Sequence, residues 1–226
     1  FSYRRAANQI KSWAPDLLIM RYWLSYFAIS QGYIAQQMSD RTKVISIVDN
    51  VIPHERRFFD TPLTKLYLER NDGLVVLSDA VKQELLNLKP NAKVVTIPHP
   101  VYDHFGAKVE RAAAQKALGL DSSKKTLLFF GLIRDYKGLD ILIDAFSMLD
   151  ESYQLVIAGE SYGSFQKYST QIENSNAKER IKVFEYYIDD SEVPLFFSAA
   201  DVTVLPYKTA TQSGISAISY HFGVPL

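Results

Sequence analysis

Residues 127–149 read LLFFGLIRDYKGLDILIDAFSML, and this stretch decides the fold. The apolar run 127–130 predicts a strand with both faces covered, because a strand with one solvated face alternates apolar and polar residues. After a short loop, apolar residues recur at steps of three and four, which predicts a helix with one buried face. They are Leu139, Leu142, Ile143, Phe146 and Leu149. A strand, a loop and a helix in this order predict one unit of a parallel α/β sheet.

The same alternation of apolar runs and helical patterns fills the chain. The expected strands are residues 17–20, 44–48, 74–77, 94–97, 127–130, 155–158, 181–184 and 202–205. An irregular segment with Pro98 and Gly106, followed by an Ala-rich helix at 109–118, separates the first four from the last four. The sequence therefore predicts an α/β protein with two Rossmann-like parallel-sheet domains, 1–105 and 106–226. We expect both domains to be incomplete, because the chain opens in a helical pattern and stops at the start of an apolar run.

The composition excludes several classes of function. The 25 basic and 25 acidic residues balance, so the chain lacks the basic charge with which proteins bind nucleic acid, and no nucleic-acid partner is expected. No cysteine is present, and the four histidines lack the spacing of metal ligands, so neither a disulfide nor a metal site is expected. The absence of G-x-G-x-x-G and P-loop motifs disfavours a dinucleotide dehydrogenase or a P-loop enzyme. No apolar run approaches the roughly 20 residues that span a bilayer.

Cations follow the strand at 127–130. Arg134 and Lys137 lie in the loop between this strand and the helix that begins near Gly138. Ligands of open α/β sheets bind at the carboxyl ends of strands, and two cations there suit a diphosphate. The alternative is an ordinary solvated loop, and the pattern alone does not separate the two interpretations.

Small polar residues follow the strand at 202–205. Residues 205–214 read LPYKTATQSG and lead into a helix at 215–220. Free backbone N–H groups at such a helix start hold an anion well. The alternative is that Ser213 simply caps the helix, which is worth about 1 kcal/mol.

Two further strand ends carry candidate residues. After the strand at 44–48, Asn50, His54 and Glu55 lie at the carboxyl edge of the first sheet. His54 suits a proton carrier or a hydrogen-bonding group for a sugar, although a single loop histidine is more often a surface or structural residue. Gly159 and Glu160 occupy the equivalent place after the strand at 155–158 and form a weaker candidate.

In their order and spacing these segments resemble bacterial glycosyltransferases of family 4, which have the GT-B fold. The resemblance covers nearly the whole chain. It runs through residues 15–19 (PDLLI), 50–55 (NVIPHE), 97–100 (IPHP), 129–140, 156–160 (VIAGE), 198–201 (SAAD), 205–214 and 222–225 (FGVP).

The resemblance implies two Rossmann-like domains facing across a cleft, with the acceptor on the first and the donor on the second. It implies transfer with retention of configuration, without a metal or cofactor, from a nucleotide diphosphate sugar. His54, Arg134 and Lys137 are the catalytic candidates, with Asn50 and Glu55 on the acceptor side. The donor candidates are Gly131, Gly159, Glu160, Tyr186, Tyr187, Thr211, Gln212, Ser213 and Gly214, with the two tyrosines near the nucleobase.

The chain departs from the family pattern at several positions. Leu132 stands where many members have an arginine, and Val48 where a histidine is common. Thr211 and Ser219 stand where many members have two glutamates around the donor loop. These departures leave the donor and the residue-level mechanism open.

The leading hypothesis is a glycosyltransferase of surface polysaccharide biosynthesis that acts on a glycan, a lipid-linked or a small-molecule acceptor. We expect a cytoplasmic protein at the inner face of the membrane, and we expect this fragment alone to be inactive. The opening helix offers a basic and aromatic face for peripheral membrane contact, with Tyr3, Arg4, Arg5, Lys11 and Trp13. The alternatives are a non-catalytic sugar-nucleotide-binding or scaffold homologue and, less favoured, an epimerase or phosphorylase of the same fold.

Overall fold

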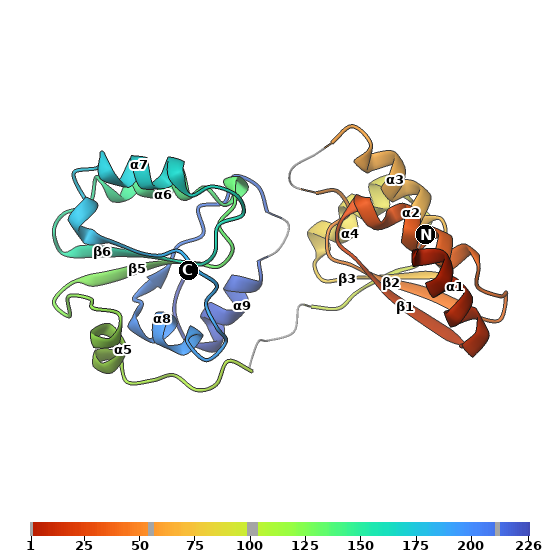
Figure 1. Cartoon of the computed structure of the whole chain (residues 1–226), viewed down its shortest axis with the longest axis horizontal. Helices are drawn as coiled ribbons and strands as arrows, with labels where there is room; N and C mark the ends of the chain where they lie inside the picture. The colour runs from red at the N-terminus through yellow and green to blue at the C-terminus, as the bar shows by residue number, and fades with distance from the viewer. Residues whose placement is uncertain (1, 54–56, 99–103, 211–212) are drawn as a thin grey trace. The chain divides into compact units, whose positions relative to one another are not determined.

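The computed structural model describes residues 2–53, 57–98, 104–210 and 213–226, which form two compact units (Figure 1). The first unit is Phe1–His99 and the second is Pro100–Leu226. This division differs from the predicted boundary at 105–106. Phe105 packs against the core of the second unit, and the Gly106 carbonyl oxygen lies 3.1 Å from His221 Nε2. Both residues therefore belong with the second unit.

The first unit has one sheet of parallel strands in the order β1-β2-β3-β4. Its elements are α1 (Ser2–Trp13), β1 (Leu17–Tyr22), η1 (Ser25–Phe27), α2 (Ala28–Gln36), β2 (Lys43–Val48), α3 (Asp60–Leu68), β3 (Gly73–Val76), α4 (Asp79–Leu88) and β4 (Val94–Thr96). Because the strands follow one another in chain order, right-handed crossovers put the connecting helices on the same face.

The two faces of this first sheet differ in burial. Val44, Ser46 and Val48 of β2 are buried, whereas Leu17 and Ile19 of β1 are 47% and 57% exposed. The apolar run of β1 therefore does not mark a strand that is covered on both faces. In the described residues of the first unit, only one face of the sheet packs on a helix layer.

The second unit also has a parallel sheet, in the order β7-β6-β5-β8. Its elements are α5 (Arg111–Ala117), β5 (Lys125–Phe130), η2 (Asp135–Lys137), α6 (Leu139–Phe146), β6 (Tyr153–Ala158), α7 (Gln166–Glu173), η3 (Lys178–Arg180), β7 (Ile181–Phe184), α8 (Val193–Ala199), β8 (Val202–Thr203) and α9 (Gly214–His221).

Helices cover both faces of this second sheet. Phe129 of β5 belongs to a core cluster with α6 and α7, whereas Leu128 and Phe130 belong to another with α5, α8 and α9 (Figure 1). Successive residues of β5 are thus buried on opposite sides, as the apolar run predicts. All eight predicted strands and the helix after β5 are present, so the α/β fold class is confirmed.

The strand order of the second unit marks a candidate position for a ligand. The chain runs from β5 through β6 to β7 in one direction and then returns to place β8 on the other side of β5. The carboxyl ends of β5 and β8 flank the point where the order reverses, which is where open α/β sheets bind ligands.

Candidate functional site

Two glycines bring three segments together at the carboxyl ends of β5 and β6. Gly131 follows β5 and has φ +96°, a conformation that residues with a Cβ rarely adopt. A Cβ on Gly131 would lie 3.0 Å from Ile215 Cδ1 and 3.4 Å from Lys137 Nζ. Gly159 follows β6 with φ +143°, and a Cβ there would lie 2.3 Å from the Gly131 carbonyl oxygen. Glycine at both positions therefore lets the amine of Lys137 and the first turn of α9 approach the end of β5.

Lys137, at the end of η2, is a buried cation. The residue is only 8% exposed, and burial, followed by the charge of Arg134, lowers the pKa of its amine to about 8. In the described part of the chain this amine forms no ion pair, and the centroid of the Tyr207 ring lies 5.9 Å from Nζ. Burying a cation without a carboxylate partner is costly, so this position favours the binding of an anion.

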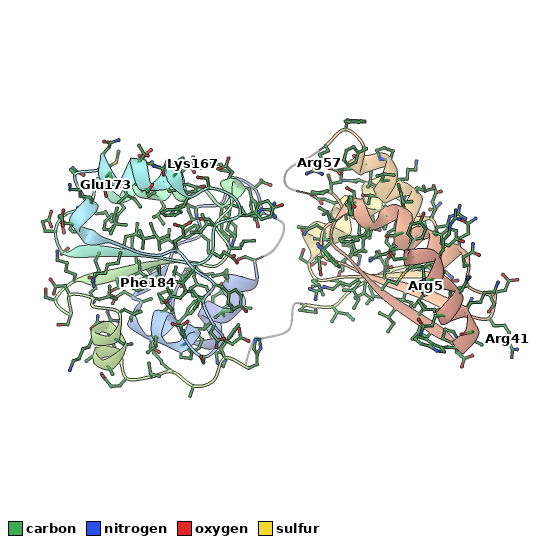
Figure 2. The ribbon with its side chains drawn as sticks, viewed as in Figure 1. Arg5, Arg41, Arg57, Lys167, Glu173 and Phe184 are labelled. Atoms are coloured by element: carbon green, nitrogen blue, oxygen red, sulfur yellow. The ribbon has the colours of Figure 1, made fainter. Side chains whose placement is uncertain are left out.

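Arg134 lies in the same loop, immediately before η2. Its Cζ is 4.3 Å from the centroid of the Tyr162 ring, so the guanidinium group stacks on an aromatic face. The next residue, Asp135, pairs with Lys167 of α7, which is labelled in Figure 2. The structure thus brings the two cations predicted for the diphosphate within electrostatic reach of each other.

The loop after β8 packs against the loop after β5. Gly138 has φ +69°, and a Cβ on it would lie 2.1 Å from the Pro206 carbonyl oxygen. The backbone N–H of Lys208 donates to the Tyr136 carbonyl oxygen at 2.8 Å, and its Nζ pairs with Asp140 Oδ2 at 2.7 Å. Lys208 is a third cation at this edge of the sheet. Lys208 belongs to segment 205–214, which the sequence analysis singled out. The sequence does not show, however, that the loop with Lys208 contacts the loop after β5.

The start of α9 differs from the capping interpretation. Ser213 occupies the N-cap position, but its side chain forms no capping hydrogen bond. Its Oγ lies instead 3.2 Å from the hydroxyl oxygen of Tyr207. The first helical residue is Gly214, one residue before the predicted start of the helix at 215. Thr211 and Gln212 lie outside the described residues.

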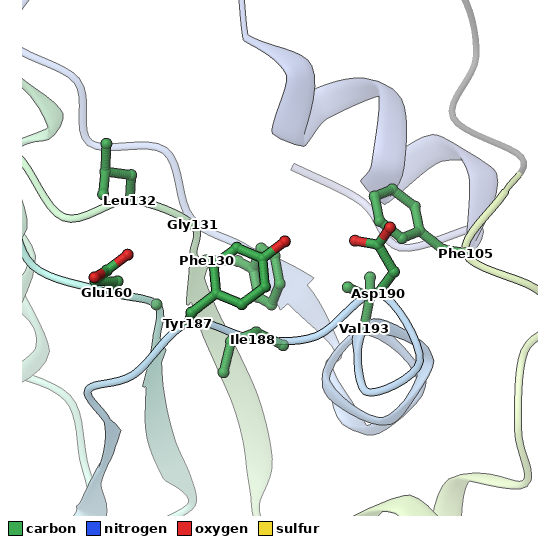
Figure 3. A pocket seen from close by; sticks show the side chains of 10 residues that line it. Phe105, Phe130, Gly131, Leu132, Glu160, Tyr187, Ile188, Asp190 and Val193 are labelled. Atoms are coloured by element: carbon green, nitrogen blue, oxygen red, sulfur yellow. The ribbon is translucent and has the colours of Figure 1, made fainter.

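A pocket of about 370 Å³ opens beside these loops, wholly within the second unit (Figure 3). It is lined by Phe105, Phe130, Gly131, Leu132, Gly159, Glu160, Tyr187, Ile188, Asp190 and Val193. Gly131 therefore belongs both to the pocket and to the surroundings of the Lys137 amine. Lys137 itself does not line the pocket, and among the described residues only Gly131 connects the two. A mostly apolar pocket with a buried cation beside it suits a ligand with a ring system at one end and an anion at the other.

Four of the predicted donor residues line this pocket. They are Gly131, Gly159, Glu160 and Tyr187. Tyr186 does not line it, because its hydroxyl donates to Glu192 Oε1 at 3.3 Å. The sequence did not single out Asp190, although it follows Tyr187 closely along the chain. Whether Asp190 faces the pocket depends on the path of the loop after β7, and no sequence motif indicates that path.

The candidate acceptor side lies at the ends of β1 and β2 in the first unit. Arg21 Nε donates to Asp49 Oδ2 at 2.8 Å and so joins the two strand ends. Asn50 follows Asp49 at this edge and is half-buried. His54 and Glu55 lie outside the described residues.

The positions that depart from the family pattern differ in their surroundings. Val48 is fully buried in the core of the first unit. Ser219 is also fully buried, and its Oγ lies 2.5 Å from Thr203 Oγ1 of β8. Neither position presents a side chain to the pocket. Leu132, by contrast, is 42% exposed and lines it.

The residues that the structure describes offer neither a metal site nor a membrane-spanning helix. These residues contain no group of three or more His, Asp and Glu side chains placed to hold a metal ion. None of the helices in the described ranges is long and apolar enough to cross a membrane.

Comparison with known proteins identifies the family. The family of glycosyl transferases group 1 matches residues 110–225, just over half of the chain, and the chain belongs to it. A GDP-mannose:glycolipid 4-beta-D-mannosyltransferase of Xanthomonas campestris pv. campestris is 26% identical over 192 residues, covering 82% of this chain and 49% of that protein. The lipopolysaccharide core biosynthesis mannosyltransferase LpsB of Rhizobium meliloti is 23% identical over 158 residues, covering 66% and 42%. The chain spans about half the length of the curated relatives it matches.

Solved structures show the same fold. Sucrose-phosphate synthase from Thermosynechococcus elongatus matches with a TM-score of 0.80 and 18% identity, covering 99% of this chain and 59% of that one. Anabaena HepE, in complex with UDP and glucose, matches with a TM-score of 0.81 and 15% identity, covering 99% and 61%. The chain therefore has the GT-B fold of glycosyltransferases, with a parallel sheet in each unit, as the sequence predicted.

Proposed function

We propose that the protein is a retaining glycosyltransferase that moves a sugar from a nucleotide diphosphate sugar to an acceptor in surface polysaccharide biosynthesis. One observation carries this proposal: Gly131 lines the pocket and also lies next to the buried amine of Lys137. A nucleoside diphosphate combines a ring system with an anion, which matches this combination. The related proteins are named for GDP-mannose and lipopolysaccharide core biosynthesis, and HepE was solved with UDP and glucose.

In this proposal the second unit holds the donor. Lys137 and Arg134 neutralise the diphosphate, with Lys as a point charge and Arg as a planar fork. Glu160 follows β6, where Rossmann-like folds place an acidic residue that accepts hydrogen bonds from the ribose hydroxyls. Backbone N–H groups at Ser213 and Gly214 add donors for the phosphates at the start of α9.

The chemical step then needs charge stabilisation more than a protein nucleophile. The bond between the anomeric carbon and the diphosphate oxygen breaks, and the acceptor oxygen bonds to the same face of that carbon. The acceptor proton passes to the leaving diphosphate oxygen. Negative charge therefore develops on the diphosphate beside Lys137 and Arg134, where fixed cations lower the barrier. His54 and Asn50 are the candidates that position the acceptor hydroxyl.

The proposal includes an acceptor at the inner face of the membrane. On α1, Arg4, Arg5 and Lys11 are exposed and Trp13 is 68% exposed; Arg5 is marked in Figure 2. Exposed basic and aromatic side chains on one helix suit a membrane interface, although at 100° per residue Arg4 and Trp13 lie on opposite sides of α1. Tyr3 does not join these exposed side chains, because its ring packs edge-on against Tyr33 at 5.4 Å.

A second candidate function is a sugar-nucleotide-binding homologue without turnover. The observation in its favour is the burial of Ser219, where many family members have a glutamate. A binding protein would retain affinity for nucleoside diphosphates and transfer no sugar.

The test is calorimetry and transfer activity of the full-length protein. We expect nucleoside diphosphate binding that weakens at least about tenfold in Lys137→Ala, because each charge-assisted contact is worth about 1.5–3 kcal/mol. Lys116→Ala, which removes an exposed lysine of α5, is the charge-matched control and should change nothing. A panel of donors, with the anomeric configuration of the product read by NMR, then tests retention. Binding without any transfer would support the second candidate, and equal affinity in both variants would remove Lys137 from the site.

A further inference from the structure

We infer that the pocket of the second unit selects guanine as the base of the donor nucleotide, and that the carboxylate of Asp190 recognises it. This inference rests on the proposed function, because it names the base of the donor proposed above. It is carried by the residues that line the pocket and by the hydrogen bonds of their neighbours.

The walls of the pocket suit a flat aromatic ring. Phe130, Ile188 and Val193 supply apolar surface, and Tyr187 beside them is 68% exposed. Figure 3 shows Tyr187 in the middle of the view, with Asp190 and Phe105 on one side and Glu160 and Leu132 on the other. Aromatic side chains bind any base by stacking, so stacking supplies affinity without selecting a base.

The polar side chains of the pocket can select one base over another, because hydrogen bonds distinguish the edges of the bases. Among the described residues that line the pocket, these are the carboxylates of Glu160 and Asp190 together with the Tyr187 hydroxyl, and none of these residues is a Lys, Arg, Asn or Gln. A carboxylate only accepts hydrogen bonds, so its ligand must donate them.

The carboxylate of Asp190 is available to accept hydrogen bonds from a ligand, whereas that of the neighbouring Asp189 is not. Asp189 Oδ1 accepts from the backbone N–H of Ser191 at 3.0 Å and from its Oγ at 2.7 Å, which closes the turn before α8. Within the described ranges Asp190 forms neither a hydrogen bond nor an ion pair through its side chain. One of two adjacent carboxylates thus shapes the loop, and the other lies at the pocket.

Guanine presents the edge that a carboxylate requires. Its N1–H and N2 amino groups are adjacent donors, and they match the two oxygens of one carboxylate. Uracil has a single N3–H between two carbonyl oxygens, and those oxygens repel a carboxylate. The amino groups of adenine and cytosine lie beside ring-nitrogen acceptors, which are repelled in the same way. A carboxylate without a nearby cation therefore favours guanine over the other bases.

The three parts of a guanosine diphosphate then have separate places. The base lies toward Asp190, and Glu160, at the opposite side of the pocket, accepts from the ribose hydroxyls (Figure 3). Gly131 lies between these ends and beside the amine of Lys137, where the diphosphate binds. Each carboxylate of the pocket thereby faces donors, and the anion faces the cation.

The experiment is calorimetric titration of the full-length protein with GDP, UDP and ADP under identical buffer and salt. We expect GDP to bind at least about tenfold more tightly than UDP or ADP, as for a bidentate contact to one base. Asp190→Ala and Asp190→Asn should reduce this preference to about threefold or less. In the Asn variant one acceptor oxygen becomes an N–H group that opposes the guanine donors. Glu185→Gln, which removes an exposed carboxylate of the same loop outside the pocket, should preserve the preference.

Each outcome has a distinct meaning. No binding of any nucleoside diphosphate to the wild type would refute the proposed function and this inference together. Binding of UDP or ADP as tight as that of GDP would overturn the inference and leave the proposed donor site in place. A GDP preference that survives both Asp190 variants would show that another group reads the base, which also overturns it.

Discussion

Lys137→Met should make the protein more stable while it weakens the binding of a nucleoside diphosphate. Methionine retains a flexible apolar chain in place of the buried stem and removes the amine. The pKa of that amine falls from 10.5 to about 8, chiefly because the folded protein takes it out of water. A tenfold change in proton affinity is worth about 1.4 kcal/mol, so burial of the protonated amine costs the folded state about 3 kcal/mol.

The variant should recover most of this cost. It loses the contact of the cation with the Tyr207 ring, worth about 1 kcal/mol, so the net gain at neutral pH is about 2 kcal/mol. The cost is fully present below about pH 8, where folded and unfolded chains both hold the proton. Between about 8 and 10.5 the folded chain releases the proton first, so the stability of the wild type rises toward that of the variant.

Urea unfolding of both proteins at neutral pH, and again above the folded-state pKa of the amine, measures this difference. Both tryptophans, Trp13 and Trp23, belong to the first unit, so tryptophan fluorescence follows that unit and far-UV circular dichroism follows both. The change should appear in the circular dichroism and not in the fluorescence. A variant less stable than the wild type at neutral pH, with a difference that does not vary with pH, would refute the burial argument. A variant that gains stability and binds nucleoside diphosphates as tightly as before would refute the donor role.

Three other predictions follow from particular residues. His54→Ala should lower kcat by about 10²–10³ and leave donor affinity unchanged, as for the loss of a positioned polar group; near-normal turnover would mean that His54 is structural. Gly138→Ala should cost at least about 2 kcal/mol of unfolding free energy and weaken nucleoside diphosphate binding, because its Cβ would lie 2.1 Å from the Pro206 carbonyl oxygen. Gly163→Ala, where φ is also positive but a Cβ meets nothing within 4 Å, is the control for backbone strain alone, and an equal loss in both would contradict the loop-packing argument. Finally, the full-length protein should co-migrate with anionic liposomes in flotation, less so at high salt or with the cations of α1 reversed; no co-migration would end the proposal of membrane contact.

The sequence located the strand ends on which the site is built. Gly131, Gly159 and Glu160 were candidates because each follows an apolar run, and all three line the pocket. Apolar runs and loop cations are local features, so one segment is enough to recognise them. The sequence did not show which of two adjacent residues faces the pocket. Tyr186 and Tyr187 look equivalent in sequence, yet of the two only Tyr187 lines the pocket. The direction of each side chain depends on how the loop after β7 packs against α8. The Tyr186 hydroxyl donates a hydrogen bond to Glu192, which directs this side chain away from the pocket.

The sequence by itself determined the class of fold, the positions of the strands along the described chain, and the loops that carry the candidate site. These features depend on periodicity along a single segment, because a strand buried on both faces is apolar at successive positions. Only the tertiary structure decided that the amine of Lys137 is buried and that Asp190 lies at the pocket. It also decided that one face of the first sheet carries exposed apolar residues, although β1 reads like the buried strands of the second unit. Burial and electrostatic surroundings are set by segments far apart in the chain, such as Gly131 against Ile215 and Lys137 against Tyr207, and no local pattern contains them.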